Sequence, residues 1–295
     1  MATIYTQVES NVRRTWILIS CFLIFIIFLG WLFSYLLNNS IFLILALIIA
    51  LFQSFIAYWH SDKIVLMMTG AKPIEKKDNP ELYRIVENLS ITAGLPTPKI
   101  YILPENQPNA FATGRNPEHS AIALTRGLLE KLERPELEGV ISHELSHIKN
   151  RDILLASVVV VLVGVIAILS NWFLRMGRWG RSRKREKGGS GIFLIFGLIA
   201  AILAPIIANL IQLAISRKRE FLADASGVLL TRYPEGLIRA LEKISIDQNS
   251  MNRASPSTAH LFIISPFKGK EVGNWLIKIF STHPPIQERI EALKK

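Results

Sequence analysis

The most prominent pattern along the chain is a set of long apolar runs without charged side chains. Residues 15–37 and 41–59 form two such runs, separated only by a short polar turn at residues 38–40. A bilayer core needs roughly 20 apolar residues in a helix, so each run is about long enough to cross it. The pattern predicts a transmembrane hairpin. A cleaved signal peptide is the alternative for the first run, but the run is too long and no small-residue cleavage site follows.

Two further apolar runs occur later, at residues 153–174 and 191–215. The second contains Gly197 and Pro205, which membrane helices tolerate better than soluble helices do. These runs predict a second transmembrane hairpin and bring the expected number of membrane helices to about four. The alternative is a hydrophobic hairpin buried within the protein.

The stretch between the two hairpins has the alternation and periodicity of a mixed α+β domain. Residues 81–93 have helical spacing, and residues 99–103 read as a short strand. Residues 109–113 and 120–124 read as two strands connected by turn-forming residues. The pattern predicts a small sheet, either as plain scaffold or as an edge at which an extended peptide can pair.

Residues 135–148 form the most informative helical pattern. Four apolar side chains recur at intervals of four, four and three, which places them on one face: Leu137, Ile141, Leu145 and Ile148. Pro135 suits the first helical turn. The helix is therefore expected to pack on its apolar face and to present His143 and His147 on the other.

The segment from His143 to His147 reads H-E-x-x-H. On a helix, positions i and i+4 share a face, so both imidazoles can reach one ion while Glu144 faces a nearby water. Neutral imidazole suits Zn²⁺, and a catalytic zinc leaves one coordination position open. The alternative is an amphipathic helix with two surface or core histidines.

A third ligand is expected directly after the fourth apolar run, where Glu220 and Asp224 again stand at i and i+4. Glu220 would bind the ion, and Asp224 would accept the remaining N–H of a ligand imidazole. The alternative is a pair of solvated carboxylates beside Arg217 and Arg219.

The composition supports a membrane protein. Half of the residues are apolar and the net charge is +11. More than half of that charge lies between residues 175 and 187, beside predicted membrane spans, where contact with anionic lipid headgroups is expected. No nucleic-acid-binding fold accompanies it, so nucleic acid is not an expected partner. The single cysteine, Cys21, lies in the first apolar run and allows no intramolecular disulfide.

The chain resembles the membrane-bound gluzincin peptidases of the M48 family in four segments. They are residues 143–147, Glu220 with Asp224, residues 109–114 and residues 282–285. The resemblance implies an α-helical membrane protein with a zincin-like α+β catalytic domain. It also implies one Zn²⁺ per chain, and an endopeptidase of the bacterial inner membrane that cleaves misfolded or damaged membrane proteins.

The resemblance also implies roles for individual residues. His143, His147 and Glu220 would bind zinc, and Glu144 would be the catalytic base. Residues from Asn109 through Ala110 to Phe111 would line the substrate cleft. His283 and Arg289 would approach the zinc and stabilise an oxyanion, the alternative for His283 being a capping or core histidine.

Four parts are expected along the chain: a transmembrane hairpin at 1–60, catalytic segments at 61–152 and 216–295, and a second hairpin at 153–215 with a basic loop at 175–190. Cations flanking the first hairpin place the catalytic segments in the cytoplasm: Arg13, Arg14, Lys63, Lys72, Lys76 and Lys77. The basic loop conflicts with this orientation if the later runs cross the membrane completely.

The zinc helix, if it continues into the third run, would place the metal on the order of 10 Å from the membrane. Cleavage close to the membrane is therefore expected. Residues 247–260 read as a mobile loop, and the apolar residues 261–264 and 275–280 could cover the site or touch the membrane interface. The expected partners are the lipid bilayer, damaged membrane proteins as substrates, and other membrane quality-control proteases. The rival functions are a catalytically inactive membrane scaffold and a transporter with a structural zinc; nearly charge-free spans argue against the transporter.

Overall fold

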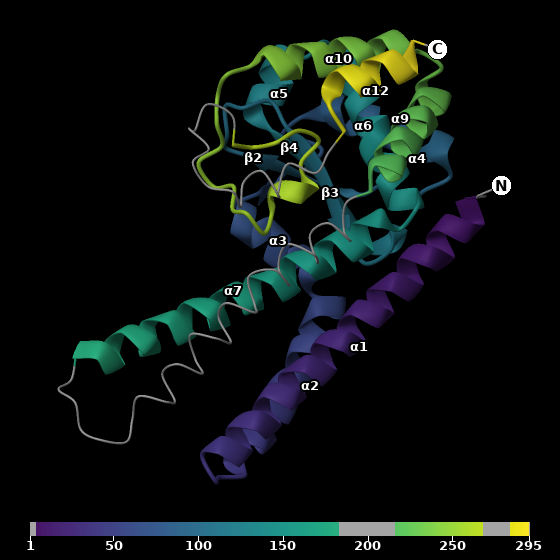
Figure 1. The fold of residues 1–295 in the computed structure, drawn as a ribbon. Coiled ribbons are helices and arrows are strands. Elements are labelled where there is room, and N and C mark those ends of the chain that lie inside the picture. The colour runs from purple at the N-terminus through teal and green to yellow at the C-terminus, as the bar shows by residue number, and fades with distance from the viewer. Residues whose placement is uncertain (1–3, 183–215, 268–283, 295) are drawn as a thin grey trace.

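The computed structural model describes residues 4–182, 216–267 and 284–294. A mixed α+β head stands on long helices (Figure 1). Within the described residues, three helices are long and apolar enough to cross a membrane. The candidate spans are Gln7–Leu36, Ile41–Trp59 and Asp152–Asn171. The fourth predicted run, residues 191–215, lies outside the described residues.

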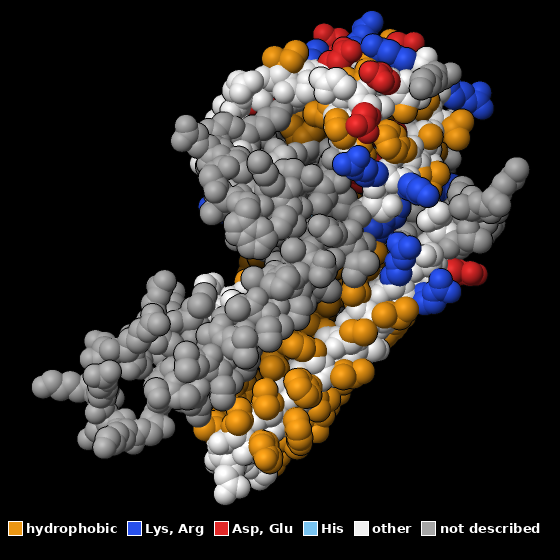
Figure 2. Space-filling model, in the orientation of Figure 1, with side chains coloured by type: hydrophobic (Ala, Val, Ile, Leu, Met, Phe, Trp, Pro, Cys, Tyr) orange, Lys and Arg blue, Asp and Glu red, His pale blue; other side chains and the backbone are white. Residues whose placement is uncertain are grey.

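The first hairpin consists of α1 (Ile4–Leu36) and α2 (Ile41–Trp59), as the apolar pattern predicts. A Cβ atom on Gly30 would lie 2.2 Å from the Cβ of Ala46, so only glycine allows this close approach of the two helices. Apolar side chains cover the outward surface of the hairpin (Figure 2). Such a large exposed apolar surface is what a bilayer would cover.

The third span belongs to α7 (Asp152–Ser182), which packs against the hairpin through a shared apolar cluster. In α7, 61% of the span is buried within the protein, against 17% in α2. α7 is therefore the innermost of the three helices. Its helical backbone continues to Ser182, so residues 175–182 of the predicted basic loop at 175–190 are helical. The rest of that loop lies outside the described residues.

Among the described residues, the sheet of the head has four strands in the order β1-β2-β4-β3. β2 and β4 run parallel, and the other two pairs are antiparallel. The strands are β1 (Lys72–Pro73), β2 (Lys99–Leu103), β3 (Ala110–Gly114) and β4 (Ser120–Thr125). The three strands expected from the sequence are confirmed, and β3 is an edge strand.

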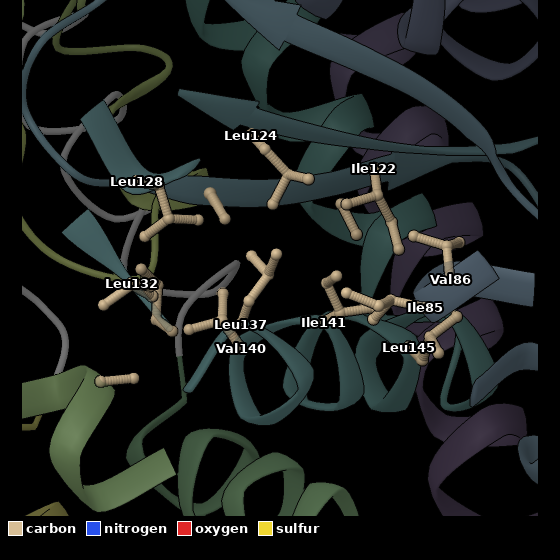
Figure 3. Packing of buried hydrophobic residues seen from close by; sticks show 14 of the residues in the cluster. Ile85, Val86, Ile122, Leu124, Leu128, Leu132, Leu137, Val140, Ile141 and Leu145 are labelled. Atoms are coloured by element: carbon tan, nitrogen blue, oxygen red, sulfur yellow. The ribbon is translucent and has the colours of Figure 1, made fainter. Parts of the chain in front are cut away.

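The central helix, α6 (Arg134–Lys149), packs its predicted apolar face against the sheet. Figure 3 shows Val140, Ile141 and Leu145 of α6 facing Ile122 and Leu124 of β4. All five side chains are fully buried. This packing directs the opposite face of α6 toward the site.

The remaining described elements surround this core. α3 (Ser61–Thr69) connects the hairpin to the sheet, and α9 (Arg217–Thr231) packs along α6. The others are α4 (Pro80–Ala93), η1 (Pro117–His119), α5 (Arg126–Lys131), α10 (Pro234–Ile246), η2 (Ala259–Leu261) and α12 (Ile286–Leu293).

The expected continuation of the zinc helix into the third span is wrong. α6 ends at Lys149, and Arg151 adopts a left-handed backbone with φ of 59° before α7 begins. A left-handed residue cannot continue a right-handed helix, so the chain turns here. The polar segment 247–260, expected to be mobile, is instead fastened: the buried Glu105 carboxylate accepts hydrogen bonds from the backbone N–H groups of Asn252 and Arg253 at 3.0 Å each.

Candidate metal centre

Helix α6 delivers three of the site residues. Its start is fixed by a capping box, in which Glu133 and Glu136 each bind the other's backbone N–H. From this start the helix runs without interruption through His143, Glu144 and His147, and all three side chains line one cavity. The regular helix therefore sets the spacing of the two imidazoles, whose ring centroids lie 4.7 Å apart.

Helix α9 delivers the carboxylates, and one glycine allows it to approach α6. A Cβ atom on Gly227 would lie 3.0 Å from the backbone nitrogen of His143 and 3.2 Å from its Cα. Gly227 stands three residues after Asp224, so the close contact lies one turn from the site. Because Gly227 has no side chain, α9 can pack close enough to α6 to place Glu220 and Asp224 beside His143.

The three predicted ligands converge. The Nε2 atoms of His143 and His147 lie 3.2 Å apart, and Glu220 oxygens lie 3.9 Å and 3.7 Å from them, respectively. Ligands bound tetrahedrally at zinc–nitrogen and zinc–oxygen distances of about 2.0–2.1 Å are roughly 3.3 Å apart. All the ligand atoms lie within 4.8 Å of one another. This donor set fits a zinc ion in both chemistry and spacing.

His143 is held by a buried ion pair on its far side. Its Nδ1 lies 2.9 Å from Asp224, as predicted for that carboxylate. Arg289 binds the same carboxylate with two nitrogens, at 2.6 and 2.8 Å. Burial alone would raise the pKa of Asp224, but the charge and hydrogen bonds of Arg289, together with His143, lower it to about 2.

His147 is held by a residue that the sequence analysis missed, Asp152. Its Nδ1 lies 2.9 Å from Oδ2 of Asp152, the first residue of α7. Burial alone would lower the pKa of His147, but this hydrogen bond and the charges of Glu220, Asp152 and Glu144 raise it to about 9. The carboxylates around His147 therefore stabilise a positive charge there, whereas burial lowers the pKa of His143.

Glu144 lies in the same cavity and is 2% exposed. Burial raises the pKa of Glu144 to about 7, and the negative charge of Glu220 contributes to the rise. A hydrogen bond from the backbone of Ala112 acts in the opposite direction. Glu144 is thus placed between the ligand cluster and edge strand β3.

The residues predicted to line the cleft, 109–111, lie buried beside the cavity and do not line it. Phe111 is fully buried and packs edge-to-face on Phe262, and the Asn109 amide donates to the carbonyl of Ile264 at 3.1 Å. The Ala110 carbonyl accepts from the backbone of Ile263. Asn109, Ala110 and Phe111 do not line the cavity, whereas Ala112 of β3 does. The edge strand is in the expected place, but residues 109–111 are covered by the chain's own segment 262–264.

The cavity is small and partly closed by that segment. Leu261, Phe262 and Ile263 line it together with the ligands, which fits the first of the two expectations for residues 261–264, that they cover the site. Residues 275–280 lie outside the described residues. The volume of the cavity is about 40 Å³. That volume holds a few water molecules but no extended peptide.

The two predicted oxyanion residues differ in outcome. His283 lies outside the described residues. Arg289 is fully buried and does not line the cavity; besides Asp224 it donates to the carbonyl of Ile263 at 3.2 Å. Its Nη1 also lies 3.8 Å from Oε2 of Glu220, so Arg289 approaches the ligand cluster as predicted. Its role at a substrate oxyanion stays a prediction.

An H-E-x-x-H helix and a carboxylate from a second helix, in a protein with membrane-spanning helices, define the class of membrane metalloproteases. The family model described as "Peptidase family M48" matches residues 76–295. The chain belongs to this family.

Similar proteins agree with that assignment. The chain is 50% identical over 260 residues to a "Protease HtpX homolog" of Syntrophobacter fumaroxidans, covering 85% of this chain and 89% of the relative. It is 46% identical over 298 residues to one of Thermoanaerobacter pseudethanolicus, covering 99% and 97%. The fold is similar to the crystal structure of S. mikatae Ste24p, with a TM-score of 0.50 and 20% identity, covering 92% of this chain and 62% of that protein.

Proposed function

We propose that the chain is a zinc-dependent endopeptidase of the bacterial inner membrane that cleaves misfolded or damaged membrane proteins close to the cytoplasmic membrane face. The observation that carries the proposal is the convergence of His143, His147 and Glu220, with ligand atoms within 4.8 Å, beside Glu144. Zinc held there would supply Lewis acidity to a peptide carbonyl and to water.

The chain's own residues would handle the proton. Glu144 would accept a proton from the water that attacks the peptide carbonyl. As the C–N bond breaks, Glu144 would pass that proton to the leaving amine. Asp224 and Asp152 would keep the two imidazoles oriented by accepting hydrogen bonds from their Nδ1–H groups, which leaves each Nε2 lone pair for the ion.

The membrane position of the site supports the proposed substrate class. Asp152, which contacts His147 directly, is also the first residue of a candidate span. The site would therefore reach loops and unfolded segments near the bilayer more readily than distant soluble domains. Partners would be such damaged membrane proteins, the bilayer itself and other quality-control proteases.

The cytoplasmic orientation is supported by charge. Lys and Arg side chains gather where the apolar helices meet the head (Figure 2). Arg13 and Arg14 on α1 and Lys63 on α3 belong to the sequence flanking the first hairpin. Lys and Arg side chains close to the ends of membrane helices favour the cytoplasmic side for those ends.

The experiment compares wild type with Glu144→Gln in sealed membrane vesicles to which unfolded casein is added. Inside-out vesicles of the wild type should degrade casein, and right-side-out vesicles should not. Glu144→Gln should keep its zinc, measured by metal analysis, while losing at least about 100-fold in rate, as loss of a general base predicts. Normal turnover by Glu144→Gln would exclude the proposed role, and cleavage only in right-side-out vesicles would exclude the orientation.

A further inference from the structure

Asn11 is a buried polar residue near the start of the first membrane helix. It is 1% exposed, on a helix that packs mainly apolar side chains against α2 and α7. An amide buried without hydrogen bonds costs several kcal/mol. All the polar atoms of this amide have partners, and those partners belong to the two segments that carry the metal ligands.

The Asn11 amide joins both sides of the site. Its Nδ2 donates to Oδ1 of Asp152 at 2.7 Å and to the carbonyl of Asn150 at 2.9 Å. Its Oδ1 accepts from Arg219 at 3.2 Å. Asn150 and Asp152 follow the α6 histidines, whereas Arg219 directly precedes Glu220 on α9. One side chain of α1 therefore bridges the His147 side and the Glu220 side.

Asp152 transmits this contact to the ligand. Its Oδ1 accepts from Asn11 and, at 3.4 Å, from Arg219, while its Oδ2 lies 2.9 Å from Nδ1 of His147. With both oxygens engaged, the carboxylate cannot rotate without breaking bonds. Its position fixes the tautomer and the ring plane of His147. The left-handed turn at Arg151 places Asp152 where it can reach His147.

We propose that Asn11 and Asp152 are positioning residues that make the first membrane helix a structural part of the metal centre. The proposal rests on the proposed zinc dependence. In this arrangement α1 is more than an anchor, because its docking on the head holds His147 in the zinc-binding orientation. Displacing α1 would loosen the metal even though α1 contributes no ligand.

The test measures zinc affinity directly, by competition with a chromogenic chelator, on the full chain in lipid nanodiscs. All variants carry Glu144→Gln, so that cleavage does not alter the samples. Asp152→Ala should weaken zinc binding roughly 10- to 100-fold, as for other partners of ligand histidines. Asn11→Leu, which keeps the branched shape but removes the amide, should weaken it about 10-fold.

Thr15→Val is the matched control. Thr15 is fully buried on the same helix one turn later, and its hydroxyl donates only within α1, to the carbonyl of Asn11 at 2.9 Å. Thr15→Val should therefore bind zinc like the parent. The absorption of bound Co²⁺ adds a geometric readout: its visible bands should shift in Asn11→Leu and remain unchanged in Thr15→Val.

A second variant guards against misfolding of Asn11→Leu. Asn11→Asp has the same volume and can still pair with Arg219, but it loses both donors and places a carboxylate against Asp152. It should bind zinc at least as weakly as Asn11→Leu. The proposal is overturned if both Asn11 variants bind like Thr15→Val, or if Thr15→Val is weakened equally. A parent protein that binds no zinc would instead overturn the proposed function itself.

Discussion

Each of the two histidines of the site contacts an aspartate, but the two aspartates have different partners. Each Nδ1 lies 2.9 Å from an aspartate, Asp224 for His143 and Asp152 for His147. Asp224 is closed into a two-pronged ion pair with the fully buried Arg289. Asp152 instead accepts a hydrogen bond from the neutral amide of Asn11, on a membrane helix, and a longer one from Arg219.

The difference shows how one metal centre can be supported by two kinds of structure. The His143 support lies within the head and depends on an ion pair with short, two-pronged contacts. The His147 support depends on how the membrane helices dock. The His147 side chain is also 16% exposed, against 1% for His143. The two ligands should therefore respond separately to substitution.

The largest effect is expected from Arg289→Met, which leaves the buried Asp224 charge without its cation. Breaking a buried pair in this way costs about 3–5 kcal/mol. Arg289→Met should thus lower the unfolding temperature strongly. Arg289→Met combined with Asp224→Leu should regain most of the stability but not the zinc affinity, because His143 has then lost its acceptor. Thermal unfolding and metal analysis of the detergent-solubilised chain test both; unchanged unfolding of Arg289→Met would contradict the ion-pair account.

A smaller effect is expected from Gly227→Val, which forces α9 away from α6. The new side chain would meet the backbone of His143, so overpacking should cost on the order of 2 kcal/mol. Zinc affinity should fall as well, because Glu220 and Asp224 move together. Gly164→Val on α7 is the control, since no atom of the described residues lies within 4 Å of a Cβ there. Equal zinc affinities for the two variants would show that the helix spacing does not set the site.

The smallest effect is expected from Arg219→Met, the counterpart of Arg289→Met on the membrane side. Arg219 contacts Asp152 at 3.4 Å and Asn11 at 3.2 Å, longer than the contacts of Arg289. Its loss should cost about 1.5 kcal/mol, as for a hydrogen bond to a charged group. Asn11 still donates to Asp152, so zinc binding should weaken only slightly. A destabilisation as large as that of Arg289→Met, by the same unfolding assay, would remove the contrast between the two supports.

Sequence spacing sufficed for the ligand cluster because a helix fixes its own geometry. His143 and His147 share a face at i and i+4, and Glu220 follows from the same rule applied to α9. The apolar stripe of α6 also packs as predicted. These features depend on local periodicity, which one sequence displays.

The contacts that support His147 could not be predicted in the same way, because they depend on tertiary packing. Asn11 and Asp152 are separated by 141 residues, and each stands at the edge of an apolar run. Polar groups at such positions are the available signal, although they do not reveal their partner. The break after Lys149 involves Arg151 in a left-handed conformation, where neither glycine nor proline marks a helix end. Likewise, strand alternation did not reveal that Ile263 covers Ala110.

The span of these contacts has a consequence for how the protein is made. Arg219 meets Asn11 across 208 residues, and Arg289 meets His143 across 146. Contacts of such large sequence separation form late, because long loops must close first. A ribosome must therefore have produced residues from both the first membrane helix and α12 before the centre is complete. The emerging polypeptide is expected to be harmless to its neighbours until α12 docks.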